Sequence, residues 1–294
     1  MKILEMNNVT KKFGNFTALD GVNLSLNQGE ILGFIGPNGA GKTTSLRILL
    51  GILKATSGSA TIFNKDSWKD AVEIHKRIAY VPGDVNLWPN LTGGEVIDLF
   101  LRLRDGKDKN YQKELLDRFD LDPTKKCRTY SKGNRQKVAL VAAFASDADL
   151  FLLDEPTSGL DPLMESVFQE VVREKINEGK SILLSSHILS EVERLCDRVC
   201  IIRQGQIIES GTLDELRHLT RTDVRVKTRQ PLTNLSQFKE IHQLEEKDNG
   251  VHFTIDGEHL GKVIKYISQF DVESLECMPP TLEELFMSHY SERT

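Results

Sequence analysis

The chain has 294 residues, 39% of them hydrophobic, which is long enough for one large core or for one core with a small second domain. Charged residues make up 28% and the net charge is -5, so the sequence lacks the dense basic surface of a general nucleic-acid binder. Its apolar runs are far shorter than the ~20 residues that cross a bilayer, and the first residues lack the pattern of a signal peptide.

Short apolar runs that resemble strands alternate with helical stretches over the first two thirds of the chain. The predicted strands cover residues 29–36, 60–65, 76–82, 150–156, 180–187 and 199–208. Residues 42–53 are predicted as an amphipathic helix, and residues 88–121 as a mostly helical insert. The β-branched and leucine-rich strands indicate a sheet that is covered on both faces.

The pattern changes after about residue 213. Strands are predicted at residues 222–228 and 272–278, helices at 232–241, 257–270 and 281–290, and a hairpin at 241–255 with its turn at Asp248-Asn249-Gly250. The order β-α-β-β-α-β is that of the split βαβ, ferredoxin-like unit. We therefore expect an α/β domain over residues 1–213, with a helical subdomain at about 86–146, and a small α+β domain over residues 214–294.

The spacing of the cysteines argues against a metal site. None of the four cysteines forms a CxxC pair, and Cys196 and Cys200 have no further Cys or His close in sequence. Buried thiols and a reducing cytoplasm are favoured.

A glycine-rich stretch, GPNGAGKT, fits the pattern G-x-x-x-x-G-K-[ST] in full. Gly36, Gly39 and Gly41 let successive N–H groups turn inward as an anion nest, and the following helix adds its positive N-terminal end. Lys42 would lie between the β- and γ-phosphates, and the Thr43 hydroxyl would hold Mg²⁺. A chance glycine loop is disfavoured, because the loop follows a buried type of strand and precedes an amphipathic helix. The predicted nucleotide-binding residues here are Gly36, Pro37, Asn38, Gly39, Ala40, Gly41, Lys42, Thr43 and Thr44.

A second apolar run, LFLLDEP, ends in two adjacent carboxylates. Asp154 would hold Mg²⁺, directly or through water, and Glu155 would polarise the attacking water. Alone, an apolar run that ends in Asp-Glu is usually structural. Together with the phosphate loop, it predicts nucleotide hydrolysis.

With DEPTSGLDP and LLSSH following in order, residues 1 to about 213 resemble the ATP-binding subunit of ABC transporters. The resemblance implies a P-loop NTPase fold of the ABC ATPase type, with ATP and Mg²⁺ as cofactors. It implies that His187 is the switch histidine that reads the γ-phosphate and that Phe13 stacks on adenine, although a core position is an alternative for Phe13. It also implies a D-loop that contacts the partner subunit, made of Ser158, Gly159, Leu160 and Asp161.

Two stretches, LTGGE and YSKGN, compete for the role of the family's signature loop. YSKGN has the family's layout, because it precedes a helix that leads into the Asp-Glu strand. Thr92 of LTGGE is then predicted as a helix N-cap, with Glu95 completing a capping box. Ser131 of YSKGN would cap the signature helix, which leaves its hydroxyl and the N–H of Gly133 to bind the nucleotide of the opposite subunit.

The sequence departs from the family pattern at two positions. Lys132 replaces the first glycine of the signature, where a side chain must point away from the phosphate or add a cation near it. Gly83 stands where the family has a glutamine that touches Mg²⁺ and couples the site to the membrane partner. Asp84 or Asn86 could substitute, or the coupling could run through the backbone, and the sequence leaves these alternatives open.

The resemblance implies an ATP-hydrolysing subunit that pairs head to tail, with a second copy or a homologous ATPase, around two MgATP molecules. Its other partner would be a separately encoded membrane permease, which places the protein peripherally on the cytoplasmic face of the cell membrane. The stretch VPGDVNLWPNLTGGEVIDLF and the terminal TLEELF resemble bacterial exporters of the drug, antibiotic or lipid-related type. One alternative is a non-transport ABC-type ATPase in translation or DNA maintenance. Another is a nucleotide-binding regulator without turnover.

Overall fold

A computed structural model of the protein describes residues 1–103, 109–218, 221–247 and 250–278. Its internal contacts divide the chain into two compact units, Met1–Ser210 and Gly211–Thr294. This boundary lies slightly before residue 213, where the composition of the sequence changes.

The central sheet of the first unit has the strand order β10-β9-β3-β8-β7-β6. Its strands are β3 (Ile31–Ile35), β6 (Ile78–Val81), β7 (Leu150–Asp154), β8 (Ser181–Ser186), β9 (Arg198–Arg203) and β10 (Gln206–Thr212). β8 pairs in parallel with both β3 and β7, and all three strands are buried along their whole length. This confirms the sheet predicted to be covered on both faces, because side chains alternate between the two faces of a strand.

The single strand predicted at residues 199–208 is wrong, because the chain turns inside it. Gln204 and Gly205 have φ angles of 50° and 79°, and they separate β9 from β10. Positive φ at two successive residues is what a tight hairpin turn requires. A polar residue followed by glycine was the signal for this turn.

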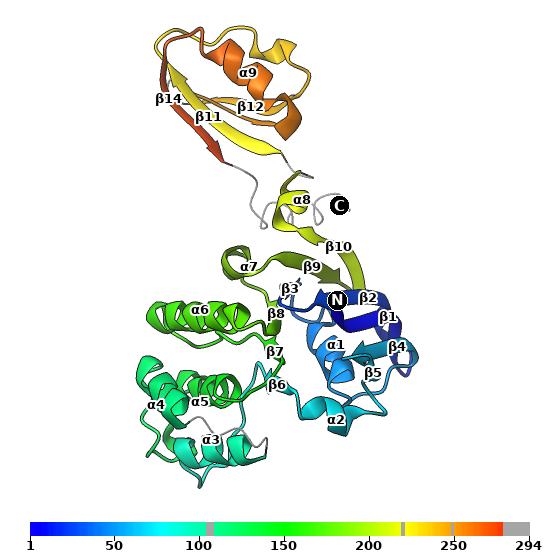
Figure 1. Ribbon diagram of the computed structural model, residues 1–294. Helices are drawn as coiled ribbons and strands as arrows, with labels where there is room; N and C mark the ends of the chain where they lie inside the picture. The colour runs from blue at the N-terminus through cyan, green and yellow to red at the C-terminus, as the bar shows by residue number, and fades with distance from the viewer. Residues whose placement is uncertain (104–108, 219–220, 248–249, 279–294) are drawn as a thin grey trace. The chain divides into compact units, whose positions relative to one another are not determined.

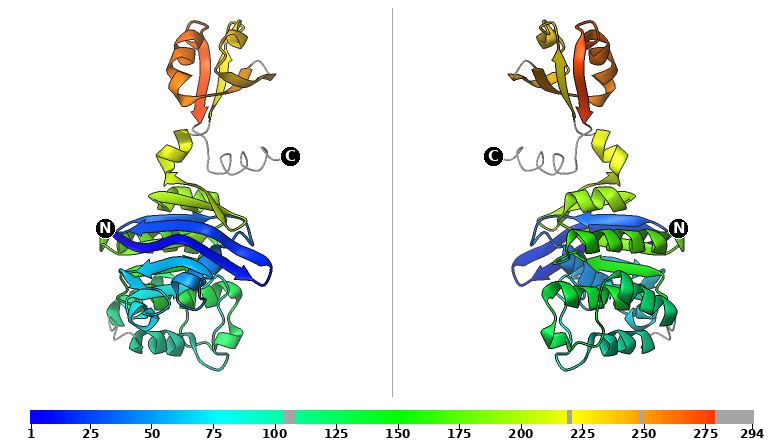
Figure 2. Two further views of the ribbon diagram at one scale, coloured as in Figure 1. Left: turned by 90° about the vertical axis from the view of Figure 1, so that its right-hand side faces the viewer. Right: turned by 90° about the vertical axis from the view of Figure 1, so that its left-hand side faces the viewer.

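A second sheet, β2-β1-β4-β5, begins with a long antiparallel hairpin that is not among the predicted strands. Its strands are β1 (Lys2–Phe13), β2 (Phe16–Asn27), β4 (Ser57–Ile62) and β5 (Lys65–Asp66). The hairpin is drawn in blue in Figure 2. Its register shifts between Met6 and Val9, where Asn8 has a positive φ of 49°, so the alternation of apolar and polar residues is interrupted.

Helices lie on both sides of the central sheet in the first unit. They are α1 (Lys42–Leu49), α2 (Ala71–His75), α3 (Gly93–Arg102), α4 (Lys109–Arg118), α5 (Lys132–Phe144), α6 (Pro162–Asn177) and α7 (Leu189–Leu195), with a 3₁₀ turn η1 (Cys127–Thr129). Figure 1 shows α1 between the two sheets, and α1 contacts β2, β4 and β7. The predicted helix at residues 42–53 ends early, at Leu49, and Gly51 follows with a positive φ of 65°. Within the described residues, no helix combines the length and apolarity that crossing a membrane requires.

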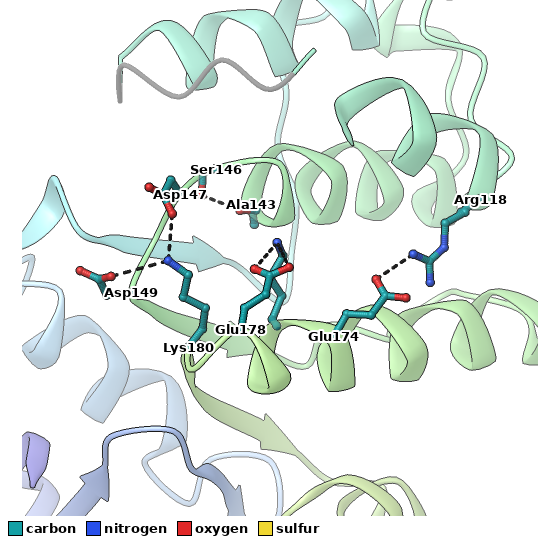
Figure 3. Close-up of polar contacts among 9 residues, drawn as sticks. Arg118, Ala143, Ser146, Asp147, Asp149, Glu174, Glu178 and Lys180 are labelled. Atoms are coloured by element: carbon teal, nitrogen blue, oxygen red, sulfur yellow. Dashed lines mark hydrogen bonds and ion pairs between the residues drawn. The ribbon is translucent and has the colours of Figure 1, made fainter. Parts of the chain in front are cut away.

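Aromatic packing and ion pairs join the helical insert to the rest of the unit. The ring of Phe144 on α5 lies 5.6 Å from that of Phe151 on β7 and 6.0 Å from that of Phe168 on α6. Arg118 on α4 donates to Glu174 on α6 at 2.8 Å, as Figure 3 shows. The helical subdomain of residues 86–146, which includes α4 and α5, is therefore anchored on α6 by a buried contact and by a polar one.

The second unit contains an antiparallel sheet of order β12-β13-β11-β14. Its elements are α8 (Leu213–His218), β11 (Thr222–Thr228), η2 (Leu235–Gln237), β12 (Ile241–Lys247), β13 (Gly250–Ile255), η3 (Gly257–His259), α9 (Leu260–Ile267) and β14 (Val272–Met278). The sheet order is that of the ferredoxin-like unit, with the 3₁₀ turn η2 where that unit has its first helix. Val263 and Ile267 of α9 are buried against the sheet with Val224 and Phe253.

One helix predicted for this unit is wrong. Residues 232–241 contain only the 3₁₀ turn η2, because Asn234 adopts a left-handed conformation with φ of 60°. Leu235 is still buried in the core of this unit, and Leu232, Phe238 and Ile241 are partly buried against it, without a helix. The helix predicted at 281–290 and the turn residues Asp248 and Asn249 lie outside the described residues.

We predict that Phe144→Ala destabilises the first unit by about 3–5 kcal/mol, because it leaves a cavity between α5, α6 and β7. Urea unfolding followed by tryptophan fluorescence measures the loss. Phe100→Ala is the matched control, since that side chain is 40% exposed. Equal destabilisation by both substitutions would contradict the role given to the Phe144 cluster.

Candidate nucleotide-binding site

The parallel pairing of three strands brings the predicted motifs to one edge of the central sheet. Ile35 pairs with Ser186, and Asp154 pairs with Ser185. The phosphate loop, Glu155 and the segment after β8 therefore all begin at neighbouring strand ends. Ligands of open α/β sheets bind at this carboxyl edge.

The phosphate loop depends on glycine at three places. Gly39 and Gly41 have positive φ angles of 80° and 116°, and Gly41 is the N-cap of α1. A Cβ atom on Gly36 would lie 2.3 Å from the carbonyl oxygen of Ile202. Asn38 and Gly39 are exposed at the tip, whereas the Ala40 N–H donates to the Pro37 carbonyl at 3.1 Å. The loop thus presents backbone around a helix N-terminus, where an anion is favoured.

Lys42 is a buried cation, only 5% exposed, that lies inside this loop. Its Nζ donates to the Gly36 carbonyl at 2.5 Å and lies 3.5 Å from Oε1 of Glu155. Burial lowers the pKa of Lys42 from its ordinary value, and the charge of Glu155 opposes that shift. The ammonium is therefore held next to the place where phosphates would bind.

Thr43 and Asp154, the two predicted Mg²⁺ ligands, are in direct contact. The Thr43 hydroxyl donates to Oδ2 of Asp154 at 3.0 Å, and the Ser185 hydroxyl donates to Oδ1 at 2.5 Å. These are hard oxygen donors on one side of the phosphate loop, so the residues fit a Mg²⁺ ion. Ser185 was missed in the sequence; a serine directly after the three apolar residues of β8 was the available signal.

Glu155 and His187 also meet. Oε1 of Glu155 lies 3.3 Å from Nδ1 of His187, which is 51% exposed. Glu155 has a positive φ of 48°, and its N–H donates to the Ser185 carbonyl at 2.9 Å. The side chain therefore leaves the strand direction and lies between Lys42 and His187.

Gly83, at the position where the family has a glutamine, lies close to the end of β7. A Cβ atom on Gly83 would lie 3.2 Å from the carbonyl oxygen of Asp154. Asp84 is exposed, and its Oδ2 accepts a long hydrogen bond of 3.5 Å from Asn86. The backbone at Gly83 therefore lies close to the carbonyl of Asp154.

Phe13 lies at the end of the β1–β2 hairpin and is 49% exposed, which argues against a core position. It pairs across the hairpin with Phe16, which is 66% exposed and was missed in the sequence. The Nζ of Lys11 lies 5.0 Å from the Phe13 ring centroid. A Cβ atom on Gly41 would meet Leu19 of β2 at 2.6 Å, so β2 packs on the phosphate loop.

The contacts of the signature residues run to α5 and to the D-loop of the same chain. Ser131 is the N-cap of α5 and accepts a hydrogen bond from the Asn134 N–H at 3.2 Å. Its O–H proton remains available to a ligand. Lys132 donates to Ser158 at 2.8 Å, so its side chain points to the D-loop.

Side-chain hydrogen bonds cap the N-termini of α3 and α6. The capping box predicted at Thr92 and Glu95 is confirmed, with both hydrogen bonds present. In the D-loop, Asp161 caps α6 by accepting from the Met164 N–H at 3.0 Å. Asp161 therefore sets where α6 begins.

A buried carboxyl that sequence reasoning missed supports the loop with His187. Glu191, 6% exposed, accepts a hydrogen bond from the Ser186 hydroxyl at 2.8 Å, and Ser186 in turn accepts from the Ile188 N–H at 3.0 Å. Burial raises the pKa of Glu191, opposed by hydrogen bonding from Ser186 and Thr157. Glu191 therefore holds Ser186 and, through it, Ile188, which are the residues on either side of His187.

Comparison with known proteins gives concordant matches. A family model described as ABC transporter matches residues 19–158, and one described as ATP-binding protein DrrA1-3-like, C-terminal domain, matches residues 211–290. The chain is 33% identical to the uncharacterized ABC transporter ATP-binding protein YhaQ of Bacillus subtilis, over 97% of each chain. It is 32% identical to the bacitracin transport ATP-binding protein BcrA of Bacillus licheniformis, over 98% of this chain and 95% of that one.

A solved structure supports the fold. A dimeric ATP-binding cassette in a post-hydrolysis state, bound to ADP and Pi, aligns with a TM-score of 0.66 at 27% identity, covering 71% of this chain and 98% of that chain. The predicted fold class, an ABC-type ATPase domain with a small α+β domain, is thereby confirmed.

We predict that Glu191→Gln flattens the pH dependence of stability. The folded chain holds the Glu191 proton more tightly than the unfolded chain, so the free energy of unfolding falls as the pH rises above the ordinary value of 4.5. The substituted protein lacks this group and should lose less stability as the pH rises above that value. Urea unfolding at a series of pH values measures the effect, with Glu258→Gln as the exposed control. Parallel curves for Glu191→Gln and the unsubstituted protein would contradict the prediction.

Proposed function

The chain belongs to the family of ABC transporter ATP-binding proteins, and from this premise we propose that it binds and hydrolyses MgATP to power a membrane exporter. The observation that carries the proposal is the meeting of Lys42, Glu155 and His187 at neighbouring strand ends. Two of these side chains are basic and lie on either side of one carboxylate. Positioning and charge compensation of this kind are what phosphoryl transfer requires.

In this proposal, each group of the site has a separate role in hydrolysis. The N–H groups of the phosphate loop and the Lys42 ammonium bind the phosphates. Thr43 and Asp154 would hold Mg²⁺, which when bound neutralises phosphate charge. Glu155 orients a water and accepts its proton while the water oxygen bonds to the γ-phosphorus and the bond to the β–γ bridging oxygen breaks. His187, held next to Glu155, contacts the γ-phosphate, and Phe13 stacks on the adenine.

The proposal includes a head-to-tail pair, with a second copy or a homologous ATPase, around two MgATP. The Ser131 hydroxyl accepts from the Asn134 N–H, which leaves its proton to donate to a ligand. The N-terminus of α5 adds its backbone N–H groups, including that of Gly133. The related cassette bound to ADP and Pi is dimeric, which supports this arrangement. In such a pair, each site combines the phosphate loop of one chain with the signature loop of the other.

An apolar cavity supports a membrane partner. It has a volume of about 320 Å³ and is lined by residues of β6, α3 and α5 and of the segment after β6, including Tyr80, Pro82, Val85, Phe100 and Val138. A cytoplasmic helix of a separately encoded permease would bury its apolar face here. The protein would then lie peripherally on the cytoplasmic face of the membrane.

Export is the proposed direction of transport. BcrA is named for bacitracin transport, and another relative, 29% identical over 97% of each chain, for linearmycin resistance. Removing an antibiotic from the cell is the simplest function common to both names. These relatives do not favour the non-transport alternative.

We predict that Glu155→Gln lowers ATP turnover by about 10²–10⁴-fold while MgATP binding is retained, because only the proton acceptor is lost. Phosphate release and nucleotide binding are measured on the same preparation. Glu165→Gln on α6 is a control on a carboxylate outside the site. Unchanged turnover would reject the role of Glu155. Absence of turnover in the unsubstituted protein and its complex would favour a nucleotide-binding regulator.

We also predict that the tagged protein, extracted in mild detergent, co-purifies with an integral membrane protein and loses it on Phe100→Asp, which places a charge in the apolar cavity. Mass spectrometry of the eluate identifies the partner. Glu258→Lys changes charge in the second unit and serves as the control. Recovery of ribosomes instead of a membrane protein would reject the transport function.

A further inference from the structure

Lys132 connects two loops that are separate in the sequence. It stands at the first glycine position of the signature pattern, and its Nζ donates to Oγ of Ser158 at 2.8 Å. Ser158 belongs to the D-loop, which follows Glu155. A glycine at position 132 would make no such bond.

The backbones of the same two loops are also in close contact. A Cβ atom on Gly133 would lie 2.4 Å from the carbonyl oxygen of Gly159, so no other residue fits there without displacement. Gly159 has a positive φ of 85°, and a Cβ atom on it would lie 3.5 Å from Cγ and Cδ of Lys132. The alkyl stem of Lys132 therefore packs along the D-loop, and its amine reaches Ser158 beyond it.

From Ser158 the contacts continue to the proposed general base. The Ser158 N–H donates to the Glu155 carbonyl at 3.1 Å, and the Glu155 N–H donates to the Ser185 carbonyl at 2.9 Å. These bonds hold Glu155 at its positive φ of 48°. A continuous series of contacts thus runs from the start of α5 to the carboxylate that faces Lys42 and His187.

We propose that Lys132 is a positioning residue that couples the signature loop to Glu155 within one chain. The coupling rests on the proposed function, in which the signature loop of one chain contacts the nucleotide of its partner. When Ser131 contacts the partner's nucleotide, the signature loop shifts. Lys132 and Ser158 pass this shift to Glu155, which belongs to the site at the same chain's own phosphate loop. Each chain would thereby adjust hydrolysis at its own site to the nucleotide state of the other.

The test compares Lys132→Met, Ser158→Ala, the double variant and Lys132→Arg in the full chain or its complex. Lys132→Met keeps an apolar stem and removes the amine, and Lys132→Arg keeps a donor. Lys113→Met on α4 is the exposed control. kcat, KM and the Hill coefficient for ATP hydrolysis are measured for each protein. Hydrogen exchange of the D-loop is measured without nucleotide.

The expected result is a loss in kcat of about two- to fivefold for Lys132→Met and for Ser158→Ala, the scale of one net hydrogen bond. The Hill coefficient falls, KM stays within about twofold, and the double variant is no worse than either single one, because both remove the same bond. D-loop exchange becomes faster in all three variants. Lys132→Arg and Lys113→Met stay close to the unsubstituted protein.

Other outcomes overturn the coupling. A rise in KM for Lys132→Met alone, with additive effects in the double variant, would mean that the amine contacts the partner's phosphate directly. Unchanged D-loop exchange and unchanged kcat would mean that the bond has no role, with the proposed ATPase function intact. An unsubstituted protein that never hydrolyses ATP would overturn the proposed function and the coupling together, even where exchange shows that the two loops are joined.

Discussion

β8 lies between the strand that leads into the phosphate loop and the strand that ends in Asp154, and the polar contacts of the site depend on this position. Parallel pairing on both sides sets the register, so the three strand ends stop at one level. β8 itself supplies Ser185, whose hydroxyl orients Asp154 and whose carbonyl holds Glu155. Ser185 of β8 therefore positions Asp154 and Glu155 at the end of the neighbouring strand β7.

Burial of the Lys42 ammonium is the electrostatic consequence of this arrangement. A buried cation is costly unless it is paired, and the Gly36 carbonyl and Glu155 provide the partners here. Phosphate oxygens that enter the loop would offer a stronger anionic partner than a carbonyl. The desolvation of Lys42 has already occurred in folding, so binding need not pay for it again. The same ion pair keeps Glu155 directed into the site.

Much of this site could be predicted because its elements have strong local signals. β3 is apolar throughout, β7 is apolar up to Asp154, and β8 has an apolar centre. The phosphate loop needs glycine at fixed places. The β1–β2 hairpin was missed, since its register shifts break the alternation by which a half-buried strand is recognised. The helix predicted at 232–241 failed because one left-handed residue, Asn234, outweighed a helical apolar pattern. A serine in β8 signals a polar group at that position, but the bonds of Ser185 to Asp154 and of Glu191 to Ser186 form only in the folded chain.

The close packing at the end of β7 also explains why a glycine stands at position 83. A Cβ atom there would crowd the Asp154 carbonyl, so the chain after β6 approaches the end of β7 with its backbone. Pro82 and Val85, on either side of Gly83 and Asp84, line the apolar cavity that would take the permease helix. In the proposed function, a shift of that helix would therefore move the backbone that lies close to the Asp154 carbonyl. Asn86 also lines this cavity and donates to Asp84 at 3.5 Å, so a side-chain route through this pair stands beside the backbone route.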